Sequence, residues 1–600
     1  MSKRFTALFL QSAVLLFCLS WLIYMMVNNE VPTDTGDGIM HFFISQASWN
    51  NPSLFLDHWG KPLFILLSSP FAQFGFNGMV VFNILIFLST VLLSNYIFFK
   101  QKTSAWISLL FPLVLLKTYD VSSTVLGGLT EPLFNLALVA ALYLLLERKY
   151  LWFALLVSFL PFMRSEGQLP IVLAFSILVL LKEYKSLPFL GAGFLIYGLI
   201  GLPVYGDFLW YFTKSPYQMD NGIYGSGPWY HYLMSYESYI GKFGLLVAIG
   251  GLFALIYLFL KRKWNAINWQ GLVFTYGVFF GVLFVHSYFW ATGQSGSLGL
   301  TRIATQGMPV FLLVNLIYIG KTPLNNLFIV NGIFTAVASV LIFLLVNTTY
   351  FPKKADPLEK EVIHAAEFLK AANLKGNKIY YHFPLFAYAY GENGRIKNTP
   401  IVHHSFAHLT HDIQQLLKPG DIIVRDSHFG PQEMHLPLKE LENRQEFVKI
   451  KEFISAEQVT DAYNEIEGVT IYQYIPTSLQ KHIIQPKAKR ILAFKEFQVE
   501  SMDEFTPIQT LFPPLTASSN INIVLTSYMD GGKLVYDVNN GEKYVAIELH
   551  AKKSFKGTFL FEKGKMTKLY IWNPTKRSGK ITVEQVTSQK VTEYPLLRQR

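Results

Sequence analysis

Two acids and a histidine follow the first apolar run of the chain, in the stretch DTGDGIMHFF at residues 34 to 43. Asp37 and His41 are four residues apart, so a helix would place them on one face, and Asp34 comes three residues earlier. A carboxylate here can take a proton from a hydroxyl group, or it can cap the helix that follows. The stretch alone leaves both interpretations open.

A second polar group lies in the stretch LDHWGKP at residues 56 to 62. It supplies Asp57, His58 and Lys61 just before another apolar segment. Acid, imidazole and ammonium are the groups needed to deprotonate a hydroxyl and to hold a phosphate. The two stretches together therefore favour a site that does chemistry over a purely structural loop.

The composition places these residues in a membrane protein. Of the 600 residues 51% are hydrophobic and only 15% are charged, which predicts a polytopic integral membrane chain. The formal net charge of +11 does not indicate nucleic acid, because many basic residues form short clusters at the ends of apolar runs. The one cysteine, Cys18, lies inside the first apolar run and excludes disulfides and cysteine-rich metal sites.

The distribution of Lys and Arg predicts the topology. Residues 5–27 are long enough for an uncleaved first helix rather than a signal peptide, with the N-terminus in the cytoplasm. Basic clusters then fall at alternate connections, as the positive-inside rule requires: Lys100 and Lys102, Arg148 and Lys149, Lys182 and Lys185, Lys261 to Lys263, and Lys321. If residues 59–75 form a re-entrant or interfacial segment, about eleven spans result. The polar connections 28–77, 119–131, 164–167, 206–238 and 291–302 then share the outer face.

The sequence after residue 350 predicts two further domains. Helical spacing at 357–372 and 406–417, with strands at 378–383 and 420–426, predicts a small α/β domain over 351–478. A basic linker at 479–490 leads to short strands separated by Gly, Asn and Asp turns, which predict a β-sandwich over 491–600. We expect both domains to be extracytoplasmic.

Other polar residues of the outer connections have two interpretations each. Arg164 and Arg302 could bind phosphate or lipid headgroups, and Glu166 could meet a sugar hydroxyl or pair with Arg164. Asp120 and Glu131 could hold a divalent cation such as Mg²⁺ or Mn²⁺, although no metal is the favoured prediction. The aromatic residues of 206–238 could stack on sugars or form a membrane-interface belt. A histidine cluster, made of His403, His404, His408, His411 and Asp412, is predicted to be a solvated face rather than a zinc site.

Several of these stretches resemble the C-type glycosyltransferases (GT-C), including aminoarabinose transferases and protein O-mannosyltransferases. The resemblance lies in the acidic first outer loop with its GKP entry, in LTEPLFNL running to RSEGQLP, and in GLTRIATQGMP, and it covers roughly residues 1–350. It implies a catalytic helical domain that transfers a sugar from a polyprenyl-phosphate donor with inversion. Asp37, or alternatively Asp34, would be the general base.

The resemblance also assigns the remaining roles. Lys61, Arg164 and Arg302 would bind the donor phosphate, while His41, His58, Glu131 and Glu166 would contact substrate. The partners would be membrane lipids, the donor, and a lipid, glycan or protein acceptor, in a multi-pass bacterial inner or plasma membrane. Two alternatives remain: a transporter or flippase of lipid-linked glycans, and a non-catalytic assembly protein with glycan-binding outer domains.

Overall fold

The computed structural model describes residues 3–103, 105–217, 225–294, 298–323, 328–372, 378–391, 401–403, 417–455, 466–476, 489–500, 502, 504–512, 519–538, 543–561 and 567–590. Contacts between Cα atoms divide the chain into two compact units. The first contains Met1–Glu359 and Tyr381–His403, and the second contains Lys360–Tyr380 and His404–Arg600. The predicted boundaries of three domains stay predictions.

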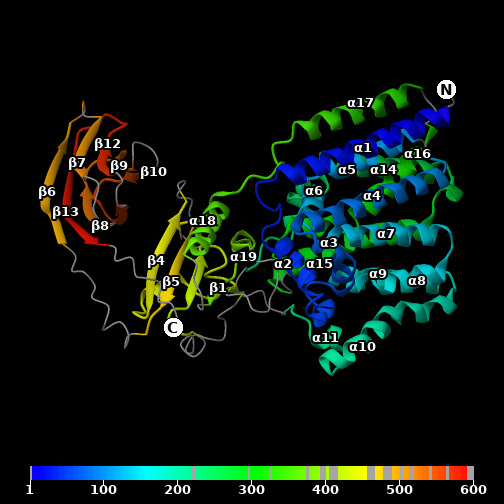
Figure 1. Cartoon of the computed structure of the whole chain (residues 1–600). Helices are drawn as coiled ribbons and strands as arrows, with labels where there is room; N and C mark the ends of the chain where they lie inside the picture. The colour runs from blue at the N-terminus through cyan, green and yellow to red at the C-terminus, as the bar shows by residue number, and fades with distance from the viewer. Residues whose placement is uncertain are drawn as a thin grey trace. The chain divides into compact units, whose positions relative to one another are not determined.

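The first unit is a helical bundle (Figure 1). Its long helices are α1 (Lys3–Asn28), α4 (Phe76–Lys100), α5 (Ala105–Lys117), α7 (Glu131–Leu146), α9 (Gln168–Leu180), α10 (Ala192–Tyr205), α14 (Gly241–Leu260), α15 (Trp269–Thr292), α16 (Met308–Gly320) and α17 (Phe328–Val346). Shorter elements join them: α2 (Asp37–Ala47), η1 (Pro52–Leu56), α3 (Pro62–Ala72), α6 (Tyr119–Leu126), α8 (Tyr150–Ser158), η2 (Leu160–Phe162), η3 (Ser165–Gly167), η4 (Tyr184–Gly191), α11 (Trp210–Thr213), α12 (His231–Met234), α13 (Tyr236–Tyr239), η5 (Trp264–Ala266) and η6 (Thr301–Thr305).

Length and apolar composition make this unit a membrane domain. Within the described ranges, six helices are long and apolar enough to cross a bilayer, or seven if the bent pair α5 and α6 forms one span. Five further apolar segments are shorter. The chain is thus an integral membrane protein, and the number of eleven spans stays a prediction.

Two connections differ from ordinary loops. Helix α3 has 11 residues, or roughly 16 Å at 1.5 Å per residue, which is too short to cross the hydrocarbon core and agrees with the expected incomplete crossing. Residues 119–131, expected to be a connection, contain helix α6, which turns by 74° from α5. Val121, Val125 and Leu126 are at most 5% exposed, so burial of this apolar face explains the extra helix.

Two buried asparagines fasten the helix ends that carry polar residues. Asn83 of α4 donates from its Nδ2 to the backbone oxygens of Thr124 and Leu129, at 3.3 and 2.8 Å. Asn135 of α7 donates to the oxygen of Thr305 at 3.2 Å and accepts from the Gly307 N–H at 2.9 Å. Because backbone groups in an apolar interior must find partners, these amides hold α6 and η6 in place.

The second unit contains the predicted strands of the α/β region. Strands β1 (Ile379–Tyr381) and β3 (Ile422–Asp426) are parallel, while β5 (Gly468–Tyr474) pairs antiparallel with β3 and with β4 (Phe447–Ile454). Helix α18 (Pro357–Ala371) confirms the helix predicted at 357–372. Three short elements complete the description: α19 (Pro384–Tyr390) and β2 (Ile401–His403), which belong to the first unit, and α21 (Leu438–Glu442), which belongs to the second. The helix predicted at 406–417 lies outside the described residues, apart from Leu417.

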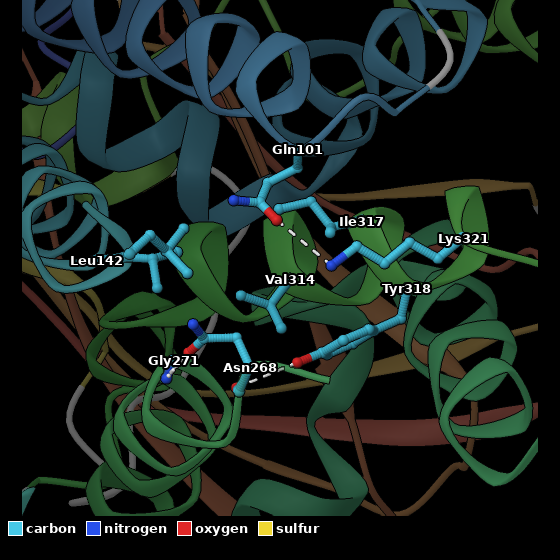
Figure 2. A pocket seen from close by; sticks show the side chains of 9 residues that line it. Gln101, Leu142, Asn268, Gly271, Val314, Ile317, Tyr318 and Lys321 are labelled. Atoms are coloured by element: carbon cyan, nitrogen blue, oxygen red, sulfur yellow. Dashed lines mark hydrogen bonds between the residues drawn. The ribbon is translucent and has the colours of Figure 1, made fainter. Parts of the chain in front are cut away.

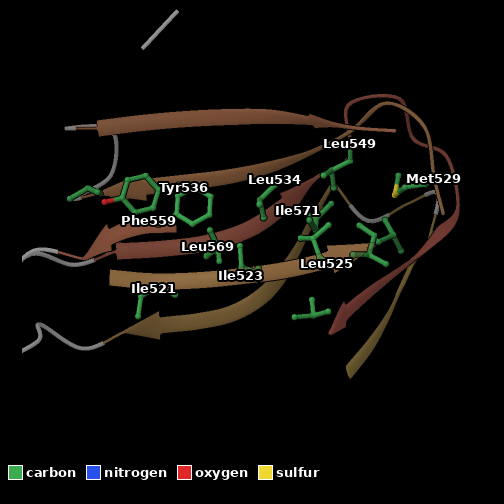
Figure 3. Packing of buried hydrophobic residues seen from close by; sticks show 14 residues of the cluster. Ile521, Ile523, Leu525, Met529, Leu534, Tyr536, Leu549, Phe559, Leu569 and Ile571 are labelled. Atoms are coloured by element: carbon green, nitrogen blue, oxygen red, sulfur yellow. The ribbon is translucent and has the colours of Figure 1, made fainter. Parts of the chain in front are cut away.

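The last eight strands form the expected β-sandwich. One sheet has the order β10-β9-β12-β7 and the other β11-β8-β13-β6. The strands are β6 (Lys489–Val499), β7 (Phe505–Phe512), β8 (Ser519–Ser527), β9 (Gly532–Val538), β10 (Lys543–Leu549), β11 (Lys553–Phe561), β12 (Thr567–Trp572) and β13 (Gly579–Lys590). Alternate residues of both sheets share one core, which includes Ile523, Leu525, Leu534 and Ile571 (Figure 3). Strand β6 begins at Lys489, inside the predicted linker.

Candidate functional site

The start of α2 is held against the end of α6 by direct contact between two glycine backbones. A Cβ atom at Gly38 would lie 2.0 Å from the Gly127 oxygen and 3.1 Å from Asp34 Cβ. Asp34 Oδ1 accepts a hydrogen bond from the Gly38 N–H at 2.8 Å. Asp34 therefore ties down the start of α2, as the capping interpretation expected, and Asp37 occupies the first helical position.

Arg302 of η6 joins the two aspartates. Its Nη1 pairs with Asp34 Oδ2 and its Nη2 with Asp37 Oδ2. The Asp37 side chain is 44% exposed and that of Asp34 is 14% exposed. Asp37 is consequently the acid that an incoming molecule reaches more easily, while Arg302 fixes the orientation of both carboxylates.

A second arginine continues the chain of alternating charges. Arg164 Nη1 lies 2.9 Å from Glu131 Oε1, and Arg164 Nη2 lies 3.2 Å from Glu166 Oε1. Glu131 Oε1 is also 4.0 Å from Nε of Arg302. The predicted pairing of Glu166 with Arg164 is present in the structure. Arg164 and Arg302 are thus both occupied by carboxylates, although we predicted them as phosphate ligands.

Lys61 is the cation of the site whose partners are neutral. Its Nζ donates to His58 O at 3.1 Å, Ser165 Oγ at 2.9 Å and Tyr217 Oη at 2.8 Å, which uses all three N–H groups. Within the described part of the chain, Lys61 forms no ion pair with a carboxylate. Burial lowers the pKa of its ammonium to about 7, and Glu166 opposes that decrease by attraction.

The backbone of Lys61 is also unusual. Its φ of 67° lies in the left-handed region, just before the proline that begins α3. This conformation is disfavoured for a residue with a side chain, so the surrounding contacts must hold it. The ammonium is therefore directed to Ser165 and Tyr217 by the backbone and by three hydrogen bonds.

The two histidines between α1 and α3 are neutral. His41 is stacked on Trp59, with ring centroids 4.5 Å apart, and burial together with the charges of Arg164 and Lys61 lowers its pKa to about 3. His58 Nε2 donates to Tyr211 O at 2.8 Å, and burial and Lys61 lower the pKa of His58 to about 4. Asp37 and His41 do share α2, but His41 is not protonated near neutral pH.

Buried carboxylate oxygens leave room for further ligands. Asp120 Oδ2 and Glu131 Oε2 have no hydrogen-bond partner among the described residues. Thr301 hydrogen-bonds the Asp120 carboxylate, which also interacts electrostatically with Arg302 and Glu131. Buried acceptors of this kind are normally satisfied by a hydroxyl, a water or a cation. The described residues contain no group of three or more His, Cys, Asp or Glu arranged to hold a metal ion.

Comparison with known proteins finds similarity to solved structures at low sequence identity. No protein-family model and no curated protein matches the chain. The chain is similar to ArnT from Cupriavidus metallidurans. The crystal structure of ArnT in the apo state aligns with 9% sequence identity and a TM-score of 0.49, over 78% of this chain and 98% of that chain. Because both values are low, the functional proposal below rests on the geometry of the site.

The structure brings together most of the residues selected from the sequence. Asp34, Asp37, Glu131, Glu166, Arg164 and Arg302 form one connected network, and Lys61 joins it through Ser165. His58 contributes its backbone oxygen to Lys61, and its ring contacts the backbone of Tyr211. The roles of all these residues stay predictions.

Several residues that hold the site together were not among those selected from the sequence. Ser165 and Tyr217 hold Lys61, Thr130 accepts from Arg164 Nη1 at 2.7 Å, and Gln306 donates to Glu166 Oε1 at 2.8 Å. His286 Nε2 lies 3.4 Å from the same Glu166 oxygen. The sequence carried a signal only for Ser165 and Gln306, because these two lie close to charged residues along the chain.

Two further groups predicted from the sequence are the aromatic connection and the histidine cluster. In the aromatic connection 206–238, Trp210 and Tyr211 are buried in a cluster with Phe162 and Tyr197, so they pack the fold rather than offer a sugar surface. Residues 218–224 lie outside the described ranges. The histidine cluster at 403–412 also lies outside them, except for the backbone of His403.

Proposed function

We propose that this protein is an inverting glycosyltransferase of the membrane, which moves a sugar from a polyprenyl-phosphate carrier to an acceptor hydroxyl. Asp37 is the general base, with Asp34 as its neighbour, and the reaction takes place at the extracytoplasmic end of the bundle. The observation that carries the proposal is that Arg302 pairs with both Asp34 and Asp37, beside Lys61, whose hydrogen-bond partners are all neutral.

The chemistry needs one proton acceptor and one phosphate-binding cation. The acceptor oxygen attacks the anomeric carbon while Asp37 takes the hydroxyl proton, and the bond from that carbon to the phosphate oxygen breaks. The electron pair leaves with the polyprenyl phosphate, so no redox partner is required. Because the donor already carries a good leaving group, the protein mainly positions the reactants and stabilises the departing charge.

Exposure and pairing favour Asp37 over Asp34 as the base. Asp34 is 14% exposed and uses Oδ1 to hold the Gly38 N–H, whereas Asp37 is 44% exposed. Arg302 pairs with Oδ2 of Asp37, and Oδ1 is the oxygen that we assign to accept the hydroxyl proton. Such fixed orientation is what general-base catalysis requires.

Lys61 is the best candidate for the phosphate. Its partners Ser165 and Tyr217 are hydroxyl groups that can be exchanged for phosphate oxygens without leaving a buried carboxylate unpaired. Taking Arg164 from Glu131 and Glu166 would leave two such carboxylates. We therefore assign Arg164 mainly to holding the acids and Lys61 to the donor.

The position of the network also favours an enzyme over a transporter. Asp37, Glu131 and Arg302 all lie in the first turns of helices or in a short 3-10 helix before one. Transporters usually bind substrate near the middle of the membrane, between broken helices. A polar network at helix ends instead faces the boundary where a lipid phosphate and a soluble acceptor can meet.

The decisive experiment is sugar transfer by purified protein with Asp37→Asn. We expect turnover from a polyprenyl-phosphate sugar donor to fall by about 10²- to 10⁴-fold, the usual contribution of a general base. Asp207→Asn, in the connection after α10, is the matched control and should retain activity. Both variants must keep the elution profile and thermal midpoint of the wild type. Unchanged turnover of Asp37→Asn would falsify the assignment of the base.

A further inference from the structure

Four turns of the helical bundle share one backbone motif with a basic residue at its centre. The turns follow α4, α7, α9 and α14, and their central residues are Lys102, Arg148, Lys182 and Arg262, with φ angles of 54°, 56°, 60° and 54°. Each of these residues donates its N–H to the oxygen three residues before it, and each following residue donates to the oxygen five residues before it. This is the Schellman motif, in which the left-handed position is usually glycine.

Lys or Arg takes the left-handed position of this motif at one end of the bundle, and glycine takes it at the other. Helix α15 ends in the same motif, with Gly293 at the left-handed position, and α10 ends at the left-handed Gly206. Those two helices end on the side of the acidic network, since His286 of α15 contacts Glu166 and Tyr205 of α10 donates to Leu56 O. A residue with a side chain is unfavourable in the left-handed region, so a favourable interaction of the basic side chains must offset this cost at the other end.

Side-chain contacts join three of the four basic turns. Lys100 pairs with Glu147 at 3.7 Å, which joins the first two turns. Lys321, at the end of α16, donates to Gln101 Oε1 at 3.3 Å and to Ala266 O at 2.9 Å, which joins the first turn to the fourth. Figure 2 shows Lys321, Gln101 and Asn268 around one cavity, whose wall also includes Leu142 of α7.

Charge is concentrated at this end. The four turns and the end of α16 contain ten basic residues, Lys100, Lys102, Arg148, Lys149, Lys182, Lys185, Lys261, Arg262, Lys263 and Lys321, against the two acids Glu147 and Glu183. Ten minus two leaves +8 of the +11 formal charge of the whole chain. The four left-handed residues are all exposed. The turns therefore present a cationic surface, which we name the basic rim.

The residues beside the turns show what the basic rim faces. Phe99, Leu180 and Leu260 directly precede or lie next to the turns and are 71%, 80% and 72% exposed. Trp152 and Trp264, which follow two of the turns, are 59% and 43% exposed. Exposed apolar residues followed by cations and amphipathic aromatics are typical of the boundary between hydrocarbon and headgroups.

We propose that the basic rim is a binding surface for the phosphates of anionic phospholipids, with Lys102, Arg148, Lys182 and Arg262 as its fixed contact points. The left-handed backbone holds each of these side chains at the helix end, where the carbonyl oxygens of the last turn also favour a cation. Attraction to an anionic leaflet offsets the unfavourable conformation. This proposal is independent of the proposed catalytic function.

The test replaces the four residues by glycine in the full-length protein: Lys102→Gly, Arg148→Gly, Lys182→Gly and Arg262→Gly together. The protein is reconstituted in bilayers of equal phosphatidylglycerol and phosphatidylcholine, extracted in mild detergent, and its retained lipids are quantified by mass spectrometry. For the wild type we expect enrichment of phosphatidylglycerol that weakens between 0.1 and 1 M salt, where screening is about threefold shorter in range. For the variant we expect the enrichment to fall at least about fivefold, the effect of one cation at a charged leaflet.

A second readout distinguishes lipid binding from a structural role. Glycine relieves the left-handed strain, so the thermal midpoint of the variant in neutral detergent should equal or exceed that of the wild type while lipid enrichment falls. If the glycine variant does not fold, the corresponding four glutamine substitutions remove the charge and keep a side chain. Lys552→Gly with Lys576→Gly is the matched control, because both lysines also have positive φ but lie in the sandwich region. No enrichment in the wild type, unchanged enrichment in the variant, or an equal loss in the control would overturn the proposal.

Discussion

Lys61 supplies the sharpest test of the site, because its buried ammonium should change protonation near neutral pH. The pKa falls from 10.5 to about 7 in the folded protein. Between these values the unfolded chain binds more protons than the folded one, so the free energy of unfolding should rise with pH. The penalty of burying the charge is complete below pH 7 and is relieved as pH approaches 10.5. The shift of about 3.5 units corresponds to a total of about 5 kcal/mol, at 1.36 kcal/mol per unit.

The variant Lys61→Met removes this titration with a side chain of similar length. We expect the thermal midpoint of the wild type to rise relative to that of Lys61→Met as pH increases from 7 to 10 in detergent. Lys214→Met removes an exposed lysine and should follow the wild type throughout. Parallel curves for the wild type and Lys61→Met would contradict the lowered pKa.

The affinity for the donor tests the lowered pKa of Lys61 a second time. A phosphate next to Lys61 favours its charged form, so the affinity of the wild type for the donor should fall above the pKa of the lysine, approaching about tenfold per pH unit. Lys61→Met should bind the donor weakly at every pH. Equal affinity of the two proteins at pH 6 would exclude Lys61 as the phosphate ligand.

Three further substitutions test the surrounding geometry. Gly38→Ala places a Cβ 2.0 Å from the Gly127 oxygen and should lower turnover by about 100-fold, because it displaces the two aspartates. The control Gly332→Ala meets open space and should keep its turnover. Equal activity of the two variants would refute the close approach. Arg302→Lys cannot hold two carboxylates at once, so kcat should fall by on the order of 100-fold with the fold retained, and full turnover would refute the clamp. His41, with a pKa of about 3, is neutral from pH 5 to 8, so His41→Gln should preserve both limbs of the pH–rate profile; loss of a limb would contradict this.

The sequence by itself determined the class of protein and its candidate residues. Apolar runs, alternating basic clusters and the strand patterns after residue 350 follow from hydrophobicity and period alone, and the structure confirms a helical membrane unit and strand-rich sheets. Asp34, Asp37 and Lys61 could be selected because acid, imidazole and ammonium groups gather in two short stretches beside apolar segments. These features depend on neighbours close along the chain.

The tertiary structure alone decided which charges meet. Arg302 lies 268 residues from Asp34 and 265 from Asp37, so no local pattern could show that it pairs with the acids. Lys61 finds Ser165 and Tyr217 at separations of 104 and 156 residues. Ion pairs and buried hydrogen bonds depend on distances of a few ångströms between distant segments, and only the packing of α2, α6, α7 and η6 sets those distances.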